Sequence, residues 1–66
     1  MLSTFNGQKL KELRAGRDLS QVELAKILYK TQHHISQIES GVIQPTAATL
    51  KGIADYFGVT MDELMQ

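Results

Sequence analysis

The sequence predicts an all-α fold, in which five short helices pack into one compact domain. Serine and threonine, which favour a helix N-terminus, recur ahead of apolar segments, and glycines recur behind them. Within these segments apolar residues stand three or four positions apart, which places them on one face of a helix. No alternating apolar run predicts a strand. The 66 residues suffice for one small core, so we expect a single domain over residues 1–66.

The first two helices are defined by a leucine pair and a capping motif. Leu10 and Leu13 lie on one helix face, and Gly16 marks the end of that helix. In "SQVE", the Ser20 side chain can accept from the backbone three residues on while Glu23 bonds back, which is the reciprocal capping box. The apolar stripe of the second helix comprises Leu24, Ala25 and Leu28, and we expect the helix to end near Leu28.

A third helix follows after a very short turn. Thr31 can cap the segment "QHHISQIES", and Gly41 ends it. Only Tyr29 and Lys30 separate Thr31 from the second helix. Two short helices joined by about three residues must cross steeply, which is the spacing of a helix-turn-helix.

The last two helices follow the only proline of the chain. Thr46 can cap "AATLKGIADYF", which Gly58 ends. The segment "TMDE", from Thr60 to Glu63, predicts a second capping box and a last short helix. The apolar residues of these two helices are Leu50, Ile53, Ala54, Phe57, Met61, Leu64 and Met65.

Composition limits the class of protein. Seven Lys plus Arg balance seven Asp plus Glu, so no global field attracts a polyanion. The chain has no cysteine, which excludes disulfides and thiolate metal sites. It lacks the pattern of a secretory signal and has no apolar stretch near the roughly 18 residues that a membrane span needs. We therefore expect a cytoplasmic protein without membrane contact and without a cofactor.

The third helix has two contrasting faces. At about 100° per residue, Ile35 and Ile38 fall on one side. The opposite side carries uncharged or titratable hydrogen-bonding groups. The alternative interpretation is an ordinary solvated face, but such a face more often carries lysine and glutamate. The major groove of B-DNA admits one helix, and glutamine and histidine can bond to purine edges there. We predict that this face reads bases through Gln32, His33, Ser36 and Gln37.

Three segments occur together in one known family. They are "LSQVELAKIL", "TQHHISQIESG" and "QPTAATLKGIADYFGVTMDELM", in this order. From about Phe5 to Met65 the chain resembles the lambda-repressor-like (Cro and repressor, XRE-type) helix-turn-helix family. The resemblance implies five helices, with the second and third as the DNA-binding unit and the third in the major groove. It implies a sequence-specific transcriptional regulator, a repressor of bacterial or phage type.

The resemblance also assigns roles to single residues. Gln32, His33 and Gln37 match positions that touch bases in family members, and Ser36 lies beside them. Gln21 matches a glutamine that holds a phosphate at the start of the second helix, where free N–H groups make an anion site. Further phosphate contacts are expected from Lys30, Thr31 and Gln44.

Arg14 and Glu39 match an ion pair between the first and third helices. Its expected role is to orient the third helix and not to touch DNA. Removing one partner should cost about 3–5 kcal/mol if the pair is buried, and little if it is exposed.

Two segments depart from the family pattern. The turn usually carries glycine and then an apolar residue, where this chain has Tyr29 and Lys30. A left-handed backbone at Tyr29 would cost about 1 kcal/mol or more relative to glycine, which predicts a turn of different shape. Val42 and Ile43 stand where relatives often have basic residues, which predicts a weaker electrostatic hold on DNA and an exposed apolar patch.

An enzyme and a metal site are not expected. His33 and His34 are adjacent, so they point about 100° apart on a helix. The residues four positions on are Gln37 and Ile38, which do not complete a metal site. The chain has no glycine-rich phosphate loop.

The alternative function is an antitoxin-like interaction module that neutralises a partner protein, with DNA autoregulation secondary. Val42, Ile43 and the apolar C-terminus could supply its patch, although so small a core also needs these C-terminal residues. Otherwise we expect a homodimer on a pseudo-palindromic operator with half-sites about 34 Å apart. A regulatory protein is a further expected partner. The predicted dimer residues are Phe57, Val59, Met61 and Met65.

Overall fold

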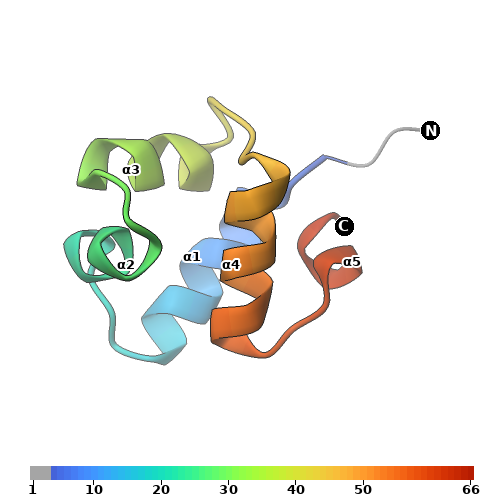
Figure 1. Ribbon diagram of the computed structural model, residues 1–66, viewed down its shortest axis with the longest axis horizontal. Helices are drawn as coiled ribbons and strands as arrows, with labels where there is room; N and C mark the ends of the chain where they lie inside the picture. Colours follow the sequence, from blue (N-terminus) through green and yellow to red (C-terminus); the bar gives the residue numbers. More distant parts are fainter. Residues whose placement is uncertain (1–3) are drawn as a thin grey trace.

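Helices account for all the regular structure in the described part of the chain. The computed structural model describes residues 4–66, which form five helices and no strand (Figure 1). The predicted all-α, five-helix fold is confirmed, with the second and third helices as the helix-turn-helix pair. The helices are α1 (Gly7–Gly16), α2 (Gln21–Leu28), α3 (Gln32–Ser40), α4 (Ala47–Phe57) and α5 (Met61–Leu64).

Four of the helices begin at the capping residues that the sequence predicts. Ser20 forms a complete capping box, because its N–H also donates to the Glu23 carboxylate at 2.8 Å. Before α5, the Thr60 hydroxyl accepts from the backbone three residues on, but no return bond is formed among the described residues. The predicted second capping box is thus only half present. Each side-chain cap contributes about 1 kcal/mol, at Ser20, Thr31, Thr46 and Thr60.

The first helix has a cap that the sequence analysis missed. The Asn6 Oδ1 atom accepts a hydrogen bond from the Lys9 N–H at 3.1 Å. Asparagine is among the favoured N-cap residues, so its place directly before "GQKL" was a usable signal.

The turn between α2 and α3 contains a left-handed residue that is not glycine. Tyr29 has φ 58° and ψ 43°, and its side chain is 93% exposed. The prediction of a differently shaped turn, made because this conformation is costly for tyrosine, is wrong. The Lys30 N–H donates to the Ala25 carbonyl at 2.8 Å, which closes the end of α2 and offsets part of the cost.

All five helices contribute to the core. In Figure 1, α1 and α4 occupy the centre of the molecule, α2 and α3 lie on one side, and α5 lies on the other. None of the helices within residues 4–66 has the length and apolar character to cross a membrane. The largest side chains with essentially no exposed surface are Leu10, Leu24, Ile35, Ile38, Ile53 and Leu64.

Phe57 belongs to this core, which corrects its assignment to a dimer interface. Its side chain is 6% exposed, so it offers little surface to a partner. The Arg17 guanidinium lies 5.1 Å from the Phe57 ring centroid and donates to the Phe57 carbonyl at 3.3 Å. The same guanidinium stacks over Tyr56 and bonds its carbonyl, so Arg17 satisfies carbonyl groups at the end of α4.

Candidate nucleic-acid interface

α3 turns one face to the core and the other to solvent. Ile35 and Ile38 have no exposed surface and fix the helix to the body of the molecule. The opposite face carries the four predicted base-reading side chains, as the helical period requires. Of these, Gln32 and His33 are exposed, and Ser36 and Gln37 are half-buried.

A buried ion pair holds α3 against α1. The Arg14 Nε donates to Glu39 Oε2 at 2.7 Å, and a second guanidinium nitrogen donates to Glu39 Oε1 at 3.1 Å. The side chains are 13% and 4% exposed, so water screens the pair weakly. Arg14 also donates to the Leu19 carbonyl at 2.7 Å, which ties the segment before α2 to the same group. The pair therefore fixes three elements, and bidentate geometry gives it directional strength.

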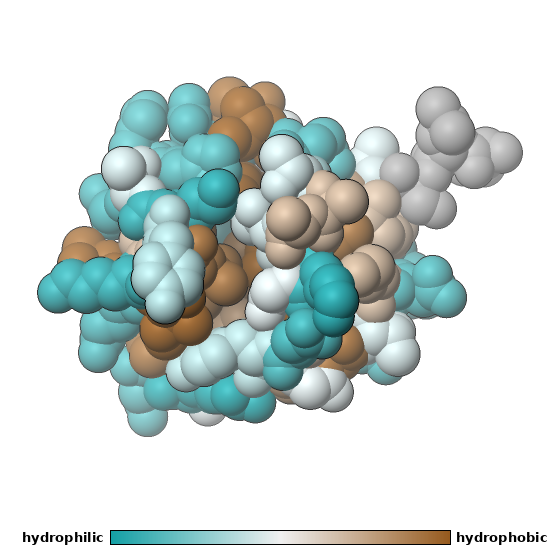
Figure 2. Space-filling model, in the orientation of Figure 1, coloured by the Kyte–Doolittle hydropathy of each residue, from teal (hydrophilic) through white to brown (hydrophobic). Residues whose placement is uncertain are grey.

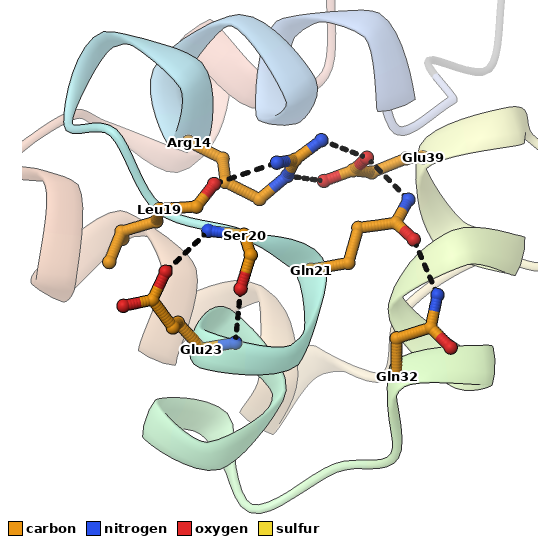
Figure 3. A network of polar contacts seen from close by, with 7 residues as sticks. All are labelled: Arg14, Leu19, Ser20, Gln21, Glu23, Gln32 and Glu39. Atoms are coloured by element: carbon orange, nitrogen blue, oxygen red, sulfur yellow. Dashed lines mark hydrogen bonds and ion pairs between the residues drawn. The ribbon is translucent and has the colours of Figure 1, made fainter.

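Two glutamines extend this ion pair to the solvent-facing side of α3. The Gln21 Nε2 donates to Glu39 Oε1 at 3.1 Å, and the Gln32 Nε2 donates to Gln21 Oε1 at 2.7 Å. Figure 3 shows the resulting row of side chains from Arg14 to Gln32. The sequence analysis treated Gln21 and Gln32 as separate contacts to phosphate and base. The structure bonds them to each other, and no sequence spacing indicates this contact because it crosses the turn.

The N-terminus of α2 already holds a negative charge. The Ser20 backbone N–H donates to the Glu23 carboxylate, which lowers the pKa of Glu23 below its ordinary value of 4.5. The bond from Glu23 N–H to the Ser20 hydroxyl completes the motif (Figure 3). This carboxylate stabilises the helix end but repels a phosphate placed there.

The other residues predicted to contact phosphate differ in which of their hydrogen-bonding groups already have partners within the protein. Lys30 is exposed in the turn between α2 and α3. The Thr31 hydroxyl accepts from the His34 N–H at 3.1 Å and so caps α3. The Gln44 Oε1 accepts from the Phe5 N–H at 2.8 Å, which ties the N-terminal segment to the α3–α4 loop. The sequence analysis missed this structural role of Gln44.

A polar groove of about 520 Å³ opens beside α3 and was not predicted. It runs between the first turn of α1 and the last turn of α3, with the ion-pair carboxylate on its wall. Among the described residues that line the groove, Lys11 is the only cationic one. The lining residues are Gly7, Gln8, Lys11, Gln21, Ser36, Glu39, Ser40 and Gly41.

The α3–α4 loop carries part of the expected apolar patch. Val42 is 70% exposed, whereas Ile43 packs against the core. Figure 2 shows apolar surface where this loop lies, at the top of the view. The patch is therefore smaller than the sequence predicts.

Most of the chain matches the sequence profile of a known protein family. The helix-turn-helix family profile matches residues 10–64. The chain belongs to the helix-turn-helix family. This finding confirms the resemblance drawn from the sequence motifs.

This helix-turn-helix domain is similar to curated bacterial regulators. It is 46% identical over 61 residues to the HTH-type transcriptional activator BcrR of Enterococcus faecalis, covering 92% of this chain and 29% of that protein. It is 37% identical over 59 residues to the HTH-type transcriptional regulator RamB of Mycobacterium tuberculosis, covering 89% and 12%. The domain therefore spans less than a third of the length of these relatives.

Solved structures share the fold of this helix-turn-helix domain. The P22 c2 repressor in complex with a synthetic operator has a TM-score of 0.86 at 22% identity, with 91% of each chain covered. PlcR of Bacillus thuringiensis, in complex with the peptide PapR7 and DNA, has a TM-score of 0.78 at 31% identity, covering 88% of this chain and 20% of that one. The match to the P22 repressor extends over nearly the whole of both chains, so it concerns the complete five-helix arrangement.

Proposed function

We propose that this helix-turn-helix domain binds double-stranded DNA in a sequence-dependent way and thereby regulates transcription in the cytoplasm. The observation that carries the proposal is the solvent-facing side of α3, where amide, imidazole and hydroxyl groups project away from two buried isoleucines. One helix of this kind fits the major groove of B-DNA. The names of the curated relatives and the DNA-bound structures of similar fold support the proposal.

Base preference arises from the four side chains on this face. Gln37 can bond to adenine N6 and N7 together, and His33 can donate to guanine. Gln32 keeps its carbonyl oxygen and one amide hydrogen for a base while it donates to Gln21. Ser36 lies beside them and can donate or accept. Each good bidentate contact adds about 1–3 kcal/mol of discrimination.

Phosphate contacts position the domain on the duplex. Lys30 supplies the charge, and Thr31, which is also exposed, lies next to it. Gln44 uses its carbonyl oxygen for Phe5, which leaves its amide N–H groups as donors to a phosphate. Gln21 can donate only the amide hydrogen that Glu39 does not take. Because so few cations take part, the affinity should fall only gently with salt.

A two-fold dimer would present two copies of α3 to successive major grooves. Half-sites about 34 Å apart on a near-palindromic operator follow from this symmetry. Three of the predicted interface residues keep surface for it, since Met61 is 41% exposed and Val59 and Met65 are half-buried. Phe57 has no comparable surface.

A regulatory protein could dock elsewhere on the domain. A groove of about 530 Å³ lies between the end of α2 and α4, and Lys30 is among the residues that line it. The sequence analysis predicted a repressor. Whether the protein represses or activates transcription would depend on where the operator lies relative to the promoter. The apolar part of the groove is formed by Ile27, Leu28, Tyr29, Ala48 and Tyr56.

Selection of bound duplexes from a random pool, at two salt concentrations, tests the proposal. We expect one consensus sequence, shared at both salt concentrations. Gln37→Ala should remove the preference at one base pair and leave binding to unrelated duplexes unchanged. An enriched pool without a consensus, or no retained duplex in dilute buffer, would contradict the proposal.

The phosphate role of Lys30 has a matched control within the chain. Lys30→Ala should weaken binding to every sequence alike and reduce the salt slope by about one phosphate. Lys51 is an exposed lysine on α4, so Lys51→Ala removes the same charge away from α3. Equal loss in the two variants would mean that only net charge matters and that Lys30 touches no phosphate.

A further inference from the structure

We propose that Asn6 and Gly7 are positioning residues for DNA reading, because they connect the C-terminal end of the domain to the C-terminal end of α3. The inference rests on the proposed function, since α3 is the element that reads DNA there. We call this connection through Asn6 and Gly7 the joint. Through the joint, a contact made at Gln66 would change the position of α3. The consequence is a route for regulation that needs no ligand at the DNA-facing surface.

Asn6 joins the two ends of the described chain. Its backbone N–H donates to the Leu64 carbonyl at 2.7 Å, and its side-chain Nδ2 donates to the Gln66 backbone oxygen at 2.7 Å. Its Oδ1 meanwhile caps α1 through the Lys9 N–H. One residue therefore fixes the start of α1 and the end of the α5 segment together.

The residue after Asn6 touches the end of α3 through backbone atoms alone. A Cβ added at Gly7 would fall well inside contact distance of the carbonyl oxygens of Ile38 and Glu39. It would also lie 2.8 Å from the Glu39 carbonyl carbon. No flexible side chain separates the two helices here, so a shift of Gly7 must shift the last turn of α3. Close-packed interiors transmit such displacements because they contain little free space.

The residue before Asn6 holds the loop that follows α3. The Phe5 N–H donates to the Gln44 Oε1 at 2.8 Å, and the Phe5 side chain lies in the core with 6% exposed. Residues 5–7 thus contact the last turn of α3, the loop after it, and the C-terminal end of the domain. The three contacts lie on consecutive residues, so they cannot move independently.

Asn6→Ser tests the joint, because serine keeps the N-cap oxygen and is too short to reach Gln66. We expect ¹⁵N–¹H NMR of the free variant to show changed amide shifts in the last turn of α3 and in residues 41–44. On the selected operator, the ratio of specific to non-specific affinity should fall by about 2- to 30-fold, the range usual for coupling between sites. Thermal stability should stay close to that of the wild type.

Two further variants serve as comparison and control. Asn6→Asp also keeps the cap and cannot donate to Gln66, so it should reproduce the α3 shifts, while its added charge lowers binding to all sequences. Thr46→Ser exchanges one capping hydroxyl for another on α4 and should leave both the α3 shifts and the affinity ratio unchanged. Gly7→Ala should change α3 most strongly, at a cost in stability.

The outcomes distinguish a failure of the proposed joint from a failure of the proposed function on which it rests. If the wild type prefers no duplex, the proposed function fails, and the NMR shifts still decide whether the joint exists. If Asn6→Ser alters only residues near its own position and near 62–66, no displacement reaches α3 and the joint is refuted. If α3 shifts but the affinity ratio on a confirmed operator stays at the wild-type value, Asn6 is not a positioning residue.

Discussion

The Gln32 Nε2 donates to the Gln21 Oε1 at 2.7 Å, so the first residue of α3 is bonded to the first residue of α2. Gln21 in turn donates to Glu39, which Arg14 holds by two hydrogen bonds. Gln32, which we propose to read a base, is therefore oriented by groups that are not proposed to contact bases. Hydrogen bonds of this kind, made behind a base-contacting side chain, restrict its rotamers before DNA binds.

Gln21→Ala should reduce base discrimination at the position that Gln32 reads. Without its partner, the Gln32 side chain regains rotamer freedom, which costs about 0.5–1.5 kcal/mol on ordering, or roughly 2- to 10-fold in the affinity ratio. Competition binding with single-base operator variants measures this. The double variant Gln21→Ala/Gln32→Ala should lose little more than Gln32→Ala, and strict additivity would show that the two act separately. Val22→Ala, at an exposed neighbouring residue, is the control.

Glu39→Ala should lower the free energy of unfolding by about 3–5 kcal/mol, because it leaves the Arg14 charge buried without its partner. Urea unfolding followed by circular dichroism gives the value. The chain supplies a matched exposed pair, Lys51 and Asp55, whose side chains are 66% and 67% exposed. Asp55→Ala should cost no more than about 0.5 kcal/mol. Equal losses in the two variants would show that burial does not strengthen the Arg14–Glu39 pair.

The capping box of α2 should make the free energy of unfolding depend on pH in the acidic range. The Ser20 N–H lowers the pKa of Glu23 in the folded protein below 4.5, so the unfolded chain binds a proton more readily. The stabilisation is therefore complete above pH 4.5 and is lost as the pH falls through the lower folded-state value. An NMR titration of the Glu23 carboxyl should have its midpoint below 4.5. Glu23→Gln should lessen the loss of stability in this range, and an identical pH profile would contradict the assignment.

Tyr29→Gly should stabilise the domain by about 0.5–1 kcal/mol, because glycine relieves the left-handed strain at some cost in unfolded-state entropy. The tyrosine is 93% exposed, so little packing is lost. The melting temperature should rise by about 4–8 °C for each kcal/mol in a domain of this size. Tyr29→Ala keeps the Cβ and the strain, so it should not share the gain. If the two variants melt together, the left-handed backbone carries no appreciable cost.

The fold was predictable from local signals, and the cooperation between site residues was not. Ser20, Thr31 and Gly41 act within a few residues of themselves, so their sequence context determines the helix ends. The burial of Phe57 and the left-handed Tyr29 depend on the packing of α4 and on backbone bonds at the end of α2. The α3 face followed from the helical period. The contacts Gln21–Gln32, Phe5–Gln44 and Asn6–Gln66 join residues 11, 39 and 60 positions apart, and no local pattern encodes them.

The contact between Asn6 and Gln66 brings the ends of the described chain together at the side of the molecule that holds α5 (Figure 1). In a domain of residues 4–66, a circular backbone closed by a short peptide between Gln66 and Thr4 is therefore compatible with the five helices as they stand. Closing the ring removes entropy from the unfolded chain and so favours the folded one. The cyclised protein would resist exopeptidases and heat, and none of its DNA-facing side chains would have to be replaced.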